Sequence, residues 1–432
     1  MDSVMHESFL HYIWQCQYFN REGLKTTNGE LISIFKNGVH NTDAGPDFSN
    51  AKIKIGDIDW AGHVEIHINS SDWNQHRHHL DAAYDNVILH VVWKHDVPII
   101  RKDGSVIPTL ALADRVDSTL VKSYQKLVNS AFSIPCAKSF AKMEDLIKLS
   151  MLDKALMQRL NSKSALVLAA HAANKGDWEE TLYQQLAKNF GFKVNAEPFL
   201  RLASTIPFRM LKKQSNSLLQ IEALLLGGAG MLETKTKDEY VASLYREYQL
   251  LKTKYTLGNV QLHAAQWKFL RLRPANFPTL RIAQFASLLY HNRNFFSQIV
   301  ETESLHDVYK LFEVNQSDYW QNHYRFGSKS QKKVAALGES SIQNIIINSI
   351  VPVLVSYGQT IDDNRYVERA IQWLENLPTE KNKITRVWED IGMKVKSSFD
   401  SQALIEQYNN MCQKRNCLNC VIGSTLLKPS SL

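Results

Sequence analysis

The 432-residue sequence lacks the features that mark membrane-spanning and secreted proteins. No stretch approaches the roughly 18–20 consecutive apolar residues of a membrane span. The N-terminus contains Asp2, His6 and Glu7 instead of a basic region followed by an apolar core, so it does not have the pattern of a signal peptide. We therefore expect a cytoplasmic protein with no membrane partner. Thiols stay reduced in that compartment, so the five cysteines are not expected to form structural disulfides.

Several common catalytic signatures are also missing. The sequence has no Gly-x-Ser-x-Gly nucleophile elbow, no Rossmann fingerprint and no fixed-period repeat. Gly327-Ser328-Lys329-Ser330 has the form of the end of a phosphate-binding loop, but the glycine and the apolar strand that should precede it are absent. These absences argue against elbow-type serine hydrolases, dinucleotide-binding domains and P-loop proteins.

The charge is divided unevenly along the chain. Residues 1–120 contain 10 Lys and Arg against 16 Asp and Glu, a net charge of −6, and they hold ten of the 15 histidines. The remainder has a net charge of +13, although the whole chain has only +7. An acidic, histidine-rich part joined to a basic part is consistent with a metal centre beside a surface that attracts polyanions, and equally with a merely solvated basic surface.

Period-two alternation predicts a sheet near the N-terminus, after an opening helix over Glu7 to Phe19. A second helix is expected from Ser70 to Tyr84, because Ser71-Asp72 is a typical helix start. The expected strands are Leu31 to Phe35, Ala51 to Ile58, Gly62 to Ile68, Val87 to Trp93 and an edge strand within Val106 to Leu112.

Helical periodicity dominates from about Val116 onward. The clearest predicted helices are Met143 to Ala173, Trp178 to Phe190, Leu218 to Leu225, Tyr240 to Tyr255, Ile282 to Tyr290, Ile342 to Tyr357 and Arg365 to Asn376. A chain of this length favours two or three domains. We predict an α+β protein with three parts. They are an α/β domain at residues 1–118, an all-α body at 119–408 that could consist of two subdomains, and a Cys-containing segment at 409–432.

The densest group of chemically active side chains combines Gly45-Pro46-Asp47 with Glu65-Ile66-His67. A carboxylate at a strand start and another on the neighbouring strand can converge on Mg²⁺ or Mn²⁺, which prefer oxygen ligands. His63, Glu65 and His67 alternate, so they share one face of their strand. His67 could then orient or deprotonate an attacking water. Alternatively, Asp47 only caps a turn while Glu65 and His67 form an exposed polar strand face.

This spacing resembles the PD-(D/E)xK nuclease signature, with His67 in place of the usual lysine. The predicted order of helix, strands, helix and strand is also similar to the restriction-endonuclease-like core. The resemblance implies that Asp47 and Glu65 are metal ligands and that Glu7 matches an acidic residue on the opening helix. Imidazole is a weaker fixed cation than ammonium near neutral pH, so His67 is a departure from the pattern. The whole chain also resembles an uncharacterised bacterial family of the domain-of-unknown-function class, through GPDF (45–48), WxGxVEIH (60–67), SSDW (70–73), VILHVVW (87–93) and CLNCVIG (417–423).

Nucleic acid is the expected partner. In some nuclease relatives the helix after the signature presents polar side chains to DNA, which implies phosphate contacts for His78 and Tyr84. On the basic body, a phosphate-tracking groove is predicted. Its expected cations are Lys268, Arg271, Arg273 and Arg281. The simpler interpretation is that these histidines and basic residues are only solvated.

The cysteines gather near the C-terminus as Cys412-x4-Cys417-x2-Cys420. A Cys-x2-Cys pair can turn both thiolates onto one metal, which predicts a Zn or Fe–S site. Cys136 or Cys16 could supply a fourth ligand. A distant cysteine joined to such a trio resembles the iron–sulfur staple of some RecB-like nucleases. Reduced, metal-free thiols are the alternative.

Three functions follow from these patterns. The first is a Mg²⁺- or Mn²⁺-dependent nuclease-like phosphodiesterase using Asp47, Glu65, His67 and Glu7. The second is a non-catalytic scaffold for nucleic acid or protein that keeps the nuclease-like fold. The third is a small-molecule metal hydrolase that uses His63, Glu65 and His67 as ligands to Zn²⁺ or Mn²⁺.

Overall fold

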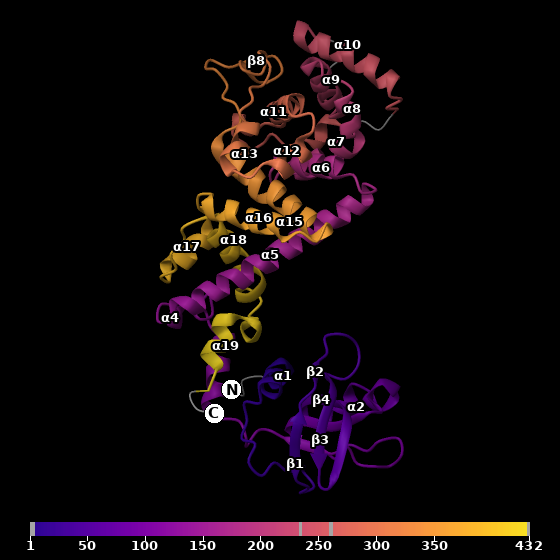
Figure 1. The fold of residues 1–432 in the computed structure, drawn as a ribbon, viewed down its shortest axis with the longest axis vertical. Helices are drawn as coiled ribbons and strands as arrows, with labels where there is room; N and C mark the ends of the chain where they lie inside the picture. Colours follow the sequence, from indigo (N-terminus) through magenta and orange to yellow (C-terminus); the bar gives the residue numbers. More distant parts are fainter. Residues whose placement is uncertain (1–4, 233–235, 259–261, 430–432) are drawn as a thin grey trace. The chain divides into compact units, whose positions relative to one another are not determined.

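The computed structural model describes residues 5–232, 236–258 and 262–429. The chain divides into two compact units (Figure 1). The first unit contains residues 1–151 and 407–432, and the second contains residues 152–406. This division differs from the predicted boundaries at 118/119 and 408/409, because the C-terminal segment belongs to the same unit as the sheet.

A mixed sheet forms the centre of the first unit. Its strands lie in the order β1-β3-β4-β5-β6, with β2 paired to β3. The strands are β1 (Ile32–Lys36), β2 (Val39–His40), β3 (Phe48–Ile55), β4 (Ile58–Asn69), β5 (Val87–Lys94) and β6 (Thr109–Ala111). β1, β3 and β4 pair antiparallel, whereas β4–β5 and β5–β6 pair parallel. β5 is buried over its first six residues, as its continuous apolar run predicts for a central strand.

The opening helix packs against this sheet. α1 (Glu7–Cys16) contacts β4 and buries Phe9, Leu10, Ile13 and Trp14. It ends before the predicted Phe19, because Gln17 adopts the left-handed conformation with φ 54° and its N–H bonds back to the helix.

The predicted helix from Ser70 to Tyr84 is wrong. The segment forms only a short helix α2 (Asp72–Gln75), followed by the 3₁₀ turns η1 (His78–Leu80) and η2 (Ala82–Tyr84). Arg77 has φ 61°, a left-handed conformation that ends a right-handed helix. The chain therefore turns between His76 and His78.

The C-terminal segment completes the first unit. It comprises the π-helix η6 (Gln407–Cys412), the 3₁₀ turn η7 (Cys417–Asn419) and α19 (Val421–Leu427), which packs against α3 (Ser118–Val128). The Arg415 guanidinium donates to the carbonyl oxygens of Phe132 and Ser130, both at 2.8 Å. These contacts join residues nearly 300 positions apart in the sequence.

The second unit is mostly helical. It is entered through the long helix α5 (Asp145–Ala173), whose first residues belong to the first unit. Its other α-helices are α6 (Trp178–Phe190), α7 (Ala196–Thr205), α8 (Phe208–Lys212), α9 (Leu218–Gly228), α10 (Glu239–Lys254), α11 (Pro278–His291), α12 (Phe295–Glu301), α13 (Leu305–Leu311), α14 (Glu339–Ile345), α15 (Val351–Thr360), α16 (Asn364–Asn376), α17 (Lys383–Asp390) and α18 (Ser398–Glu406). α6 has the bounds predicted for it. The expectation of an all-α body is wrong in one detail: β7 (His323–Arg325) and β8 (Ser328–Lys329) form a small hairpin.

One apolar helix runs through the core of this unit. α14, the π-helix η5 (Ile346–Ile350) and α15 are continuous from Glu339 to Thr360. By length and composition this helix could cross a membrane, which the sequence was not expected to contain, but 72% of its apolar window is buried inside the protein. Pro352 lacks the N–H that an α-helix would direct to the carbonyl of Asn348, and that oxygen instead accepts from Asn189 Nδ2 at 3.3 Å.

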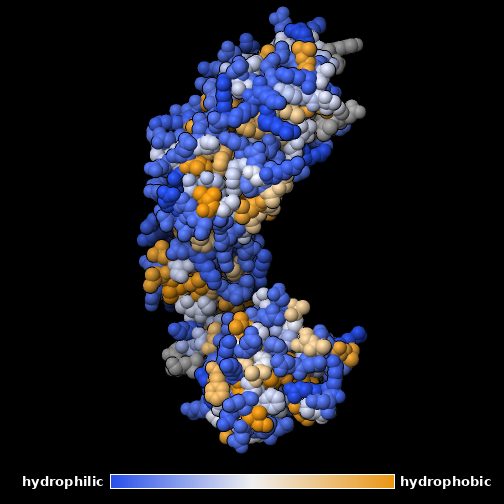
Figure 2. Space-filling view, turned by 45° about the vertical axis from the view of Figure 1, so that its right-hand side comes forward, coloured by the Kyte–Doolittle hydropathy of each residue, from blue (hydrophilic) through white to orange (hydrophobic). Residues whose placement is uncertain are grey.

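The surface is predominantly hydrophilic in the space-filling view, with separate apolar patches on both units (Figure 2). Exposed apolar side chains of the first unit include Leu31, Phe35 and Ile58, which lie at or near strand ends. Isolated apolar side chains of this kind are ordinary for a protein surface.

Candidate active site

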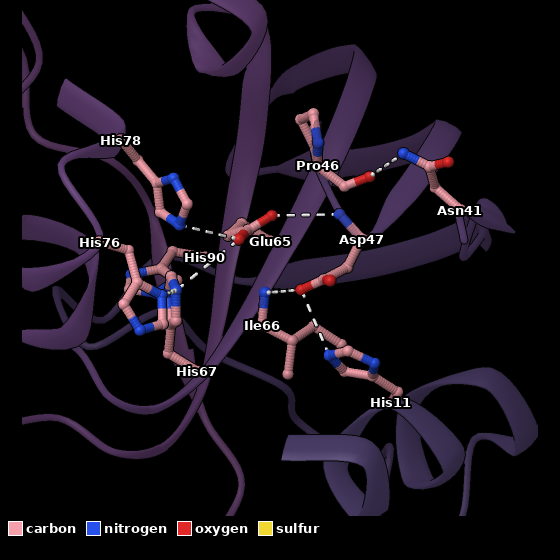
Figure 3. Close-up of polar contacts among 10 residues, drawn as sticks. All are labelled: His11, Asn41, Pro46, Asp47, Glu65, Ile66, His67, His76, His78 and His90. Carbon is pink, nitrogen blue, oxygen red and sulfur yellow. Dashed lines mark hydrogen bonds and ion pairs between the residues drawn. The ribbon is translucent and has the colours of Figure 1, made fainter. Parts of the chain in front are cut away.

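Asp47, just before β3, and Glu65, on β4, lie side by side (Figure 3). Asp47 immediately precedes β3, and Glu65 follows Val64, the β4 partner of Phe48. The Asp47 N–H donates to Glu65 Oε2 at 3.1 Å, and the Ile66 N–H donates to Asp47 Oδ2 at 2.9 Å. Each carboxylate therefore accepts from the backbone beside the other, which holds the two side chains next to each other.

The loop before β3 fixes the position of Asp47. Asn41 Nδ2 donates to the Pro46 carbonyl at 3.1 Å, and the Asn41 N–H donates to the Asp47 carbonyl at 2.7 Å. Gly45 has φ 104°, a conformation that favours glycine. The loop thus places Asp47 directly before the start of β3 in a defined orientation.

The two carboxylates differ in their surroundings. Glu65 is 4% exposed, and burial raises its pKa, while a hydrogen bond from His78 opposes the rise and the charge of Asp47 adds to it. Asp47 is partly exposed, and its Oδ2 faces His11 Nε2 on α1 at 3.3 Å. His11 was not singled out by the sequence, although it lies four residues after Glu7 and therefore on the same helix face.

Three histidines converge beside Glu65. They are His67 on β4, His76 at the end of α2 and His78 at the start of η1, and one ring nitrogen from each lies within 4.8 Å of the other two. Glu65 Oε1 is 3.2 Å from His78 Nε2 and 3.6 Å from His67 Nε2. The left-handed turn at Arg77 lets His76 and His78 face the same point. We name these four side chains, Glu65 with the three histidines, the histidine–glutamate cluster.

His67 is buried at the centre of this cluster. It is 1% exposed, and burial together with the neighbouring histidines lowers its pKa to about 2. Its ring is therefore neutral near pH 7 and keeps a lone pair available to a metal ion. This differs from a lysine ammonium, which would be a fixed positive charge.

His90 supports His67 from the adjacent strand. β4 and β5 pair so that Glu65 lies opposite His90, and His90 Nε2 is 2.8 Å from His67 Nδ1. His67 Nε2 in turn lies 3.1 Å from His76 Nδ1. A hydrogen bond at one ring nitrogen fixes which nitrogen of a histidine can coordinate a metal. His90 was not predicted as a site residue, although a histidine inside the apolar run VILHVVW was a usable signal.

Glu7 belongs to the same neighbourhood. It is half-buried in the first turn of α1, and burial raises its pKa. The charges of His76 and His11 oppose this rise, whereas those of Asp47 and Asp72 add to it. His63 lies on β4 as predicted, but it is not part of the three-histidine group.

A family model described as "Protein of unknown function (DUF2851)" matches residues 7–383. The chain belongs to the DUF2851 family. No curated protein and no solved structure matches it significantly. All side chains of the candidate site lie inside the matched region of this DUF2851 protein, and the cysteines from 412 to 420 lie beyond it.

The remaining predicted residues are divided between the two units. In the first unit, Tyr84 stacks on His78 with ring centroids 3.9 Å apart, so Tyr84 lies at the edge of the histidine–glutamate cluster. In the second unit, Lys268, Arg271 and Arg273 are exposed. Arg281 is buried, because its guanidinium donates to Asn276, Gln284 and Ser341 and lies over the Phe192 ring.

Proposed function

We propose that this DUF2851 protein is a metal-dependent hydrolase that cleaves phosphodiester bonds in nucleic acid. The observation that supports this most directly is the pairing of two backbone-anchored carboxylates, Asp47 and Glu65, with the neutral imidazole of His67. Side chains that combine buried acids with unprotonated nitrogens are suited to bind a divalent cation and to move protons next to it.

The donor set favours a cation that accepts nitrogen ligands. One ring nitrogen each from His67, His76 and His78 would hold the cation, because these atoms lie within 4.8 Å of one another, and Glu65 Oε1 lies beside them, 3.2 Å from His78 Nε2. Imidazole ligands suit Zn²⁺ best, and Mn²⁺, although it also suits carboxylate and water oxygens, binds nitrogen more readily than Mg²⁺ does. We therefore propose Zn²⁺ or, second to it, Mn²⁺ here, in preference to Mg²⁺. Such a cation would lower the pKa of a bound water and neutralise charge on a phosphate.

The surrounding side chains would position the reactants. Asp47 contributes the second carboxylate, and its Oδ2 lies 3.3 Å from His11 Nε2 and accepts from the Ile66 N–H. Glu7 retains its proton to a higher pH than an ordinary glutamate, so it is suited to protonate the leaving oxygen. His90 orients His67 and so acts on the reaction only through it.

The likeness to PD-(D/E)xK nucleases supports phosphodiester cleavage, with a changed role for the third residue. Pro46-Asp47 directly precedes β3, and Glu65-x-His67 lies on β4, the next strand, an order similar to that of the two parts of the signature. His67 replaces the lysine, but its low pKa makes it a metal ligand and not a cation. The net charge of +13 beyond residue 120, with Lys268, Arg271 and Arg273 exposed, favours a polyanionic substrate.

A cleavage assay on the full chain tests the proposal. Chelator-treated protein would be loaded with Mn²⁺, Zn²⁺ or Mg²⁺ and incubated with labelled single- and double-stranded DNA and RNA. We expect Mn²⁺ or Zn²⁺ to restore cleavage of at least one substrate, and Glu65→Gln to lower the rate by roughly 100-fold or more. His63→Gln serves as the matched control, because His63 shares the strand face of Glu65 but is not part of the three-histidine group.

Two outcomes would contradict the proposal. Equal cleavage by the wild type and Glu65→Gln would remove this site from the reaction. Metal binding without cleavage of any nucleic acid, but with hydrolysis of a small phosphodiester such as bis-p-nitrophenyl phosphate, would instead favour the small-molecule hydrolase. The three-imidazole group is the specific observation in favour of that second function.

A further inference from the structure

We propose that Cys136, Cys412, Cys417 and Cys420 bind one [4Fe–4S] cluster. These four residues come from two parts of the chain that are more than 270 residues apart, and both parts belong to the first unit. The site lies apart from the carboxylates and histidines described above and shares no residue with them.

The four cysteines surround one cavity. Cys136 precedes α4 (Ala137–Phe140), Cys412 ends η6, Cys417 begins η7 and Cys420 precedes α19. All four are buried, between 5% and 8% exposed, and they line the cavity together with Pro135, Met411 and Gly423. The fifth cysteine, Cys16, is exposed on α1 and does not line it. Of the two cysteines that could join the C-terminal trio, the fold selects Cys136.

The distances between the cysteine sulfurs favour an iron–sulfur cluster over a single zinc ion as the occupant of this site. Zinc holds four thiolates at about 2.3 Å, which brings the sulfurs within roughly 4 Å of one another. Among the described residues, the three histidines are the one group of three or more potential ligands with all donor atoms within 4.8 Å. The cysteine sulfurs are therefore spread more widely than zinc requires. An iron–sulfur cluster, which has irons and sulfides between the thiolates, holds its cysteine sulfurs further apart than a single zinc ion does.

The interior of the cavity also suits a cluster. Its lining is apolar, and all four cysteines around it are buried. Gln407 is buried, and its Nε2 donates to Cys420 Sγ at 2.9 Å. Hydrogen bonds to ligand sulfurs and exclusion of water are the features by which proteins stabilise iron–sulfur clusters.

The backbone around the trio is shaped for close approach. A Cβ at Gly423 would lie 2.0 Å from the Cys417 carbonyl oxygen, so only glycine lets α19 pack over η7. Arg415, in the left-handed conformation with φ 54°, turns the chain between Cys412 and Cys417. Its guanidinium is fixed on the carbonyls of Ser130 and Phe132, where it supplies positive charge near the anionic ligands.

Metal analysis of anaerobically purified full-length protein tests this proposal. We expect about four iron and about four sulfide per chain, with visible absorption that bleaches on dithionite reduction and a reduced-state EPR signal. Cys417→Ser should remove most of the iron, whereas Cys16→Ser should retain it. If Cys417→Ser fails to fold, the iron, sulfide and EPR measurements on the wild type still decide the question.

Other results would overturn the cluster. One zinc per chain without iron would assign the site to Zn²⁺, and four reactive thiols without metal would leave only reduced cysteines. Glu65→Gln should keep its full iron content. If Glu65→Gln loses nuclease activity but keeps its iron, that result bears only on the proposed function. Loss of iron in Cys417→Ser bears only on the iron–sulfur cluster.

Discussion

Asp47 and Glu65 stabilise each other's position through the strand backbone. The Asp47 N–H donates to the Glu65 carboxylate, and the N–H of the residue after Glu65 donates to the Asp47 carboxylate. The side chains are thus structural acceptors as well as candidate ligands. A substitution at either position must be designed so that the loss of an acceptor is not mistaken for the loss of chemistry.

A pair of variants at Asp47 separates these two effects. Asp47→Asn keeps an oxygen that can accept from the Ile66 N–H, whereas Asp47→Ala leaves that N–H without its acceptor. We expect Asp47→Ala to lower the free energy of unfolding of the first unit by about 1–3 kcal/mol, and Asp47→Asn by less. Urea denaturation measures the stability, and the cleavage assay should show low activity in both. Full activity in Asp47→Asn would show that the carboxylate charge is not needed.

His76 allows a test of metal binding with little cost to folding. It is the most exposed of the three histidines, so His76→Ala should leave the thermal unfolding temperature nearly unchanged. We expect the affinity for Mn²⁺, measured by titration calorimetry, to fall by more than the roughly 10–100-fold that loss of an outer partner costs. His79→Ala is the matched control, because His79 is nearby but outside the three-histidine group. Equal losses in both variants would refute a specific site.

The exposed cations of the second unit predict a salt dependence. Arg271→Gln combined with Arg273→Gln should weaken nucleic-acid binding and reduce the slope of log K against log salt by about 0.9 for each lost phosphate contact. Fluorescence anisotropy over a series of salt concentrations gives this slope. Lys394→Gln with Lys396→Gln removes the same charge from other exposed positions. An identical change in the two double variants would indicate only a general effect of net charge.

Glu222 in the second unit predicts a pH-dependent stability. It accepts from the Tyr240 hydroxyl at 2.7 Å and from the Ser317 hydroxyl at 2.8 Å, and burial raises its pKa to about 7 from 4.5. Between these values the folded protein holds a proton that the unfolded chain releases. Stability should therefore fall as pH rises from about 4.5 to 7, by on the order of 3 kcal/mol.

Glu222→Gln tests this assignment, since its side chain has no titrating proton. The variant should lose most of this pH dependence, and it should be at least as stable as the wild type at pH 8. Thermal and urea unfolding from pH 4.5 to 8 measure both effects. A wild-type stability that rises over this range would contradict the raised pKa.

Local patterns predicted much of the fold. The alternation around Glu65 located β4, and the continuous apolar run from Val87 located β5, because side-chain period and burial are read directly from neighbouring residues. The break at Arg77 was not predicted, since a left-handed arginine depends on tertiary contacts and not on propensity.

The candidate site was only partly predictable for the same reason. Asp47, Glu65 and His67 could be singled out because Asp47 directly precedes one predicted strand and the other two alternate on the next. His11, His76 and His90 were missed as partners, since a helix, a turn and a parallel strand bring them in from outside the motif. The fold likewise joins Cys136 to the C-terminal trio, a pairing that no local spacing in the sequence specifies.

Residues 407–427 belong to the first unit although they follow the second unit in the sequence, and this affects the order of folding during synthesis. During synthesis, the sheet and the whole of residues 152–406 leave the ribosome before η6, η7 and α19 exist. The second unit can therefore fold while the first unit still lacks α19, the helix that packs against α3. The contacts between residues nearly 300 positions apart, such as Arg415 with Ser130, then form last. A nascent chain stalled before residue 407 would expose the buried surface that these elements cover.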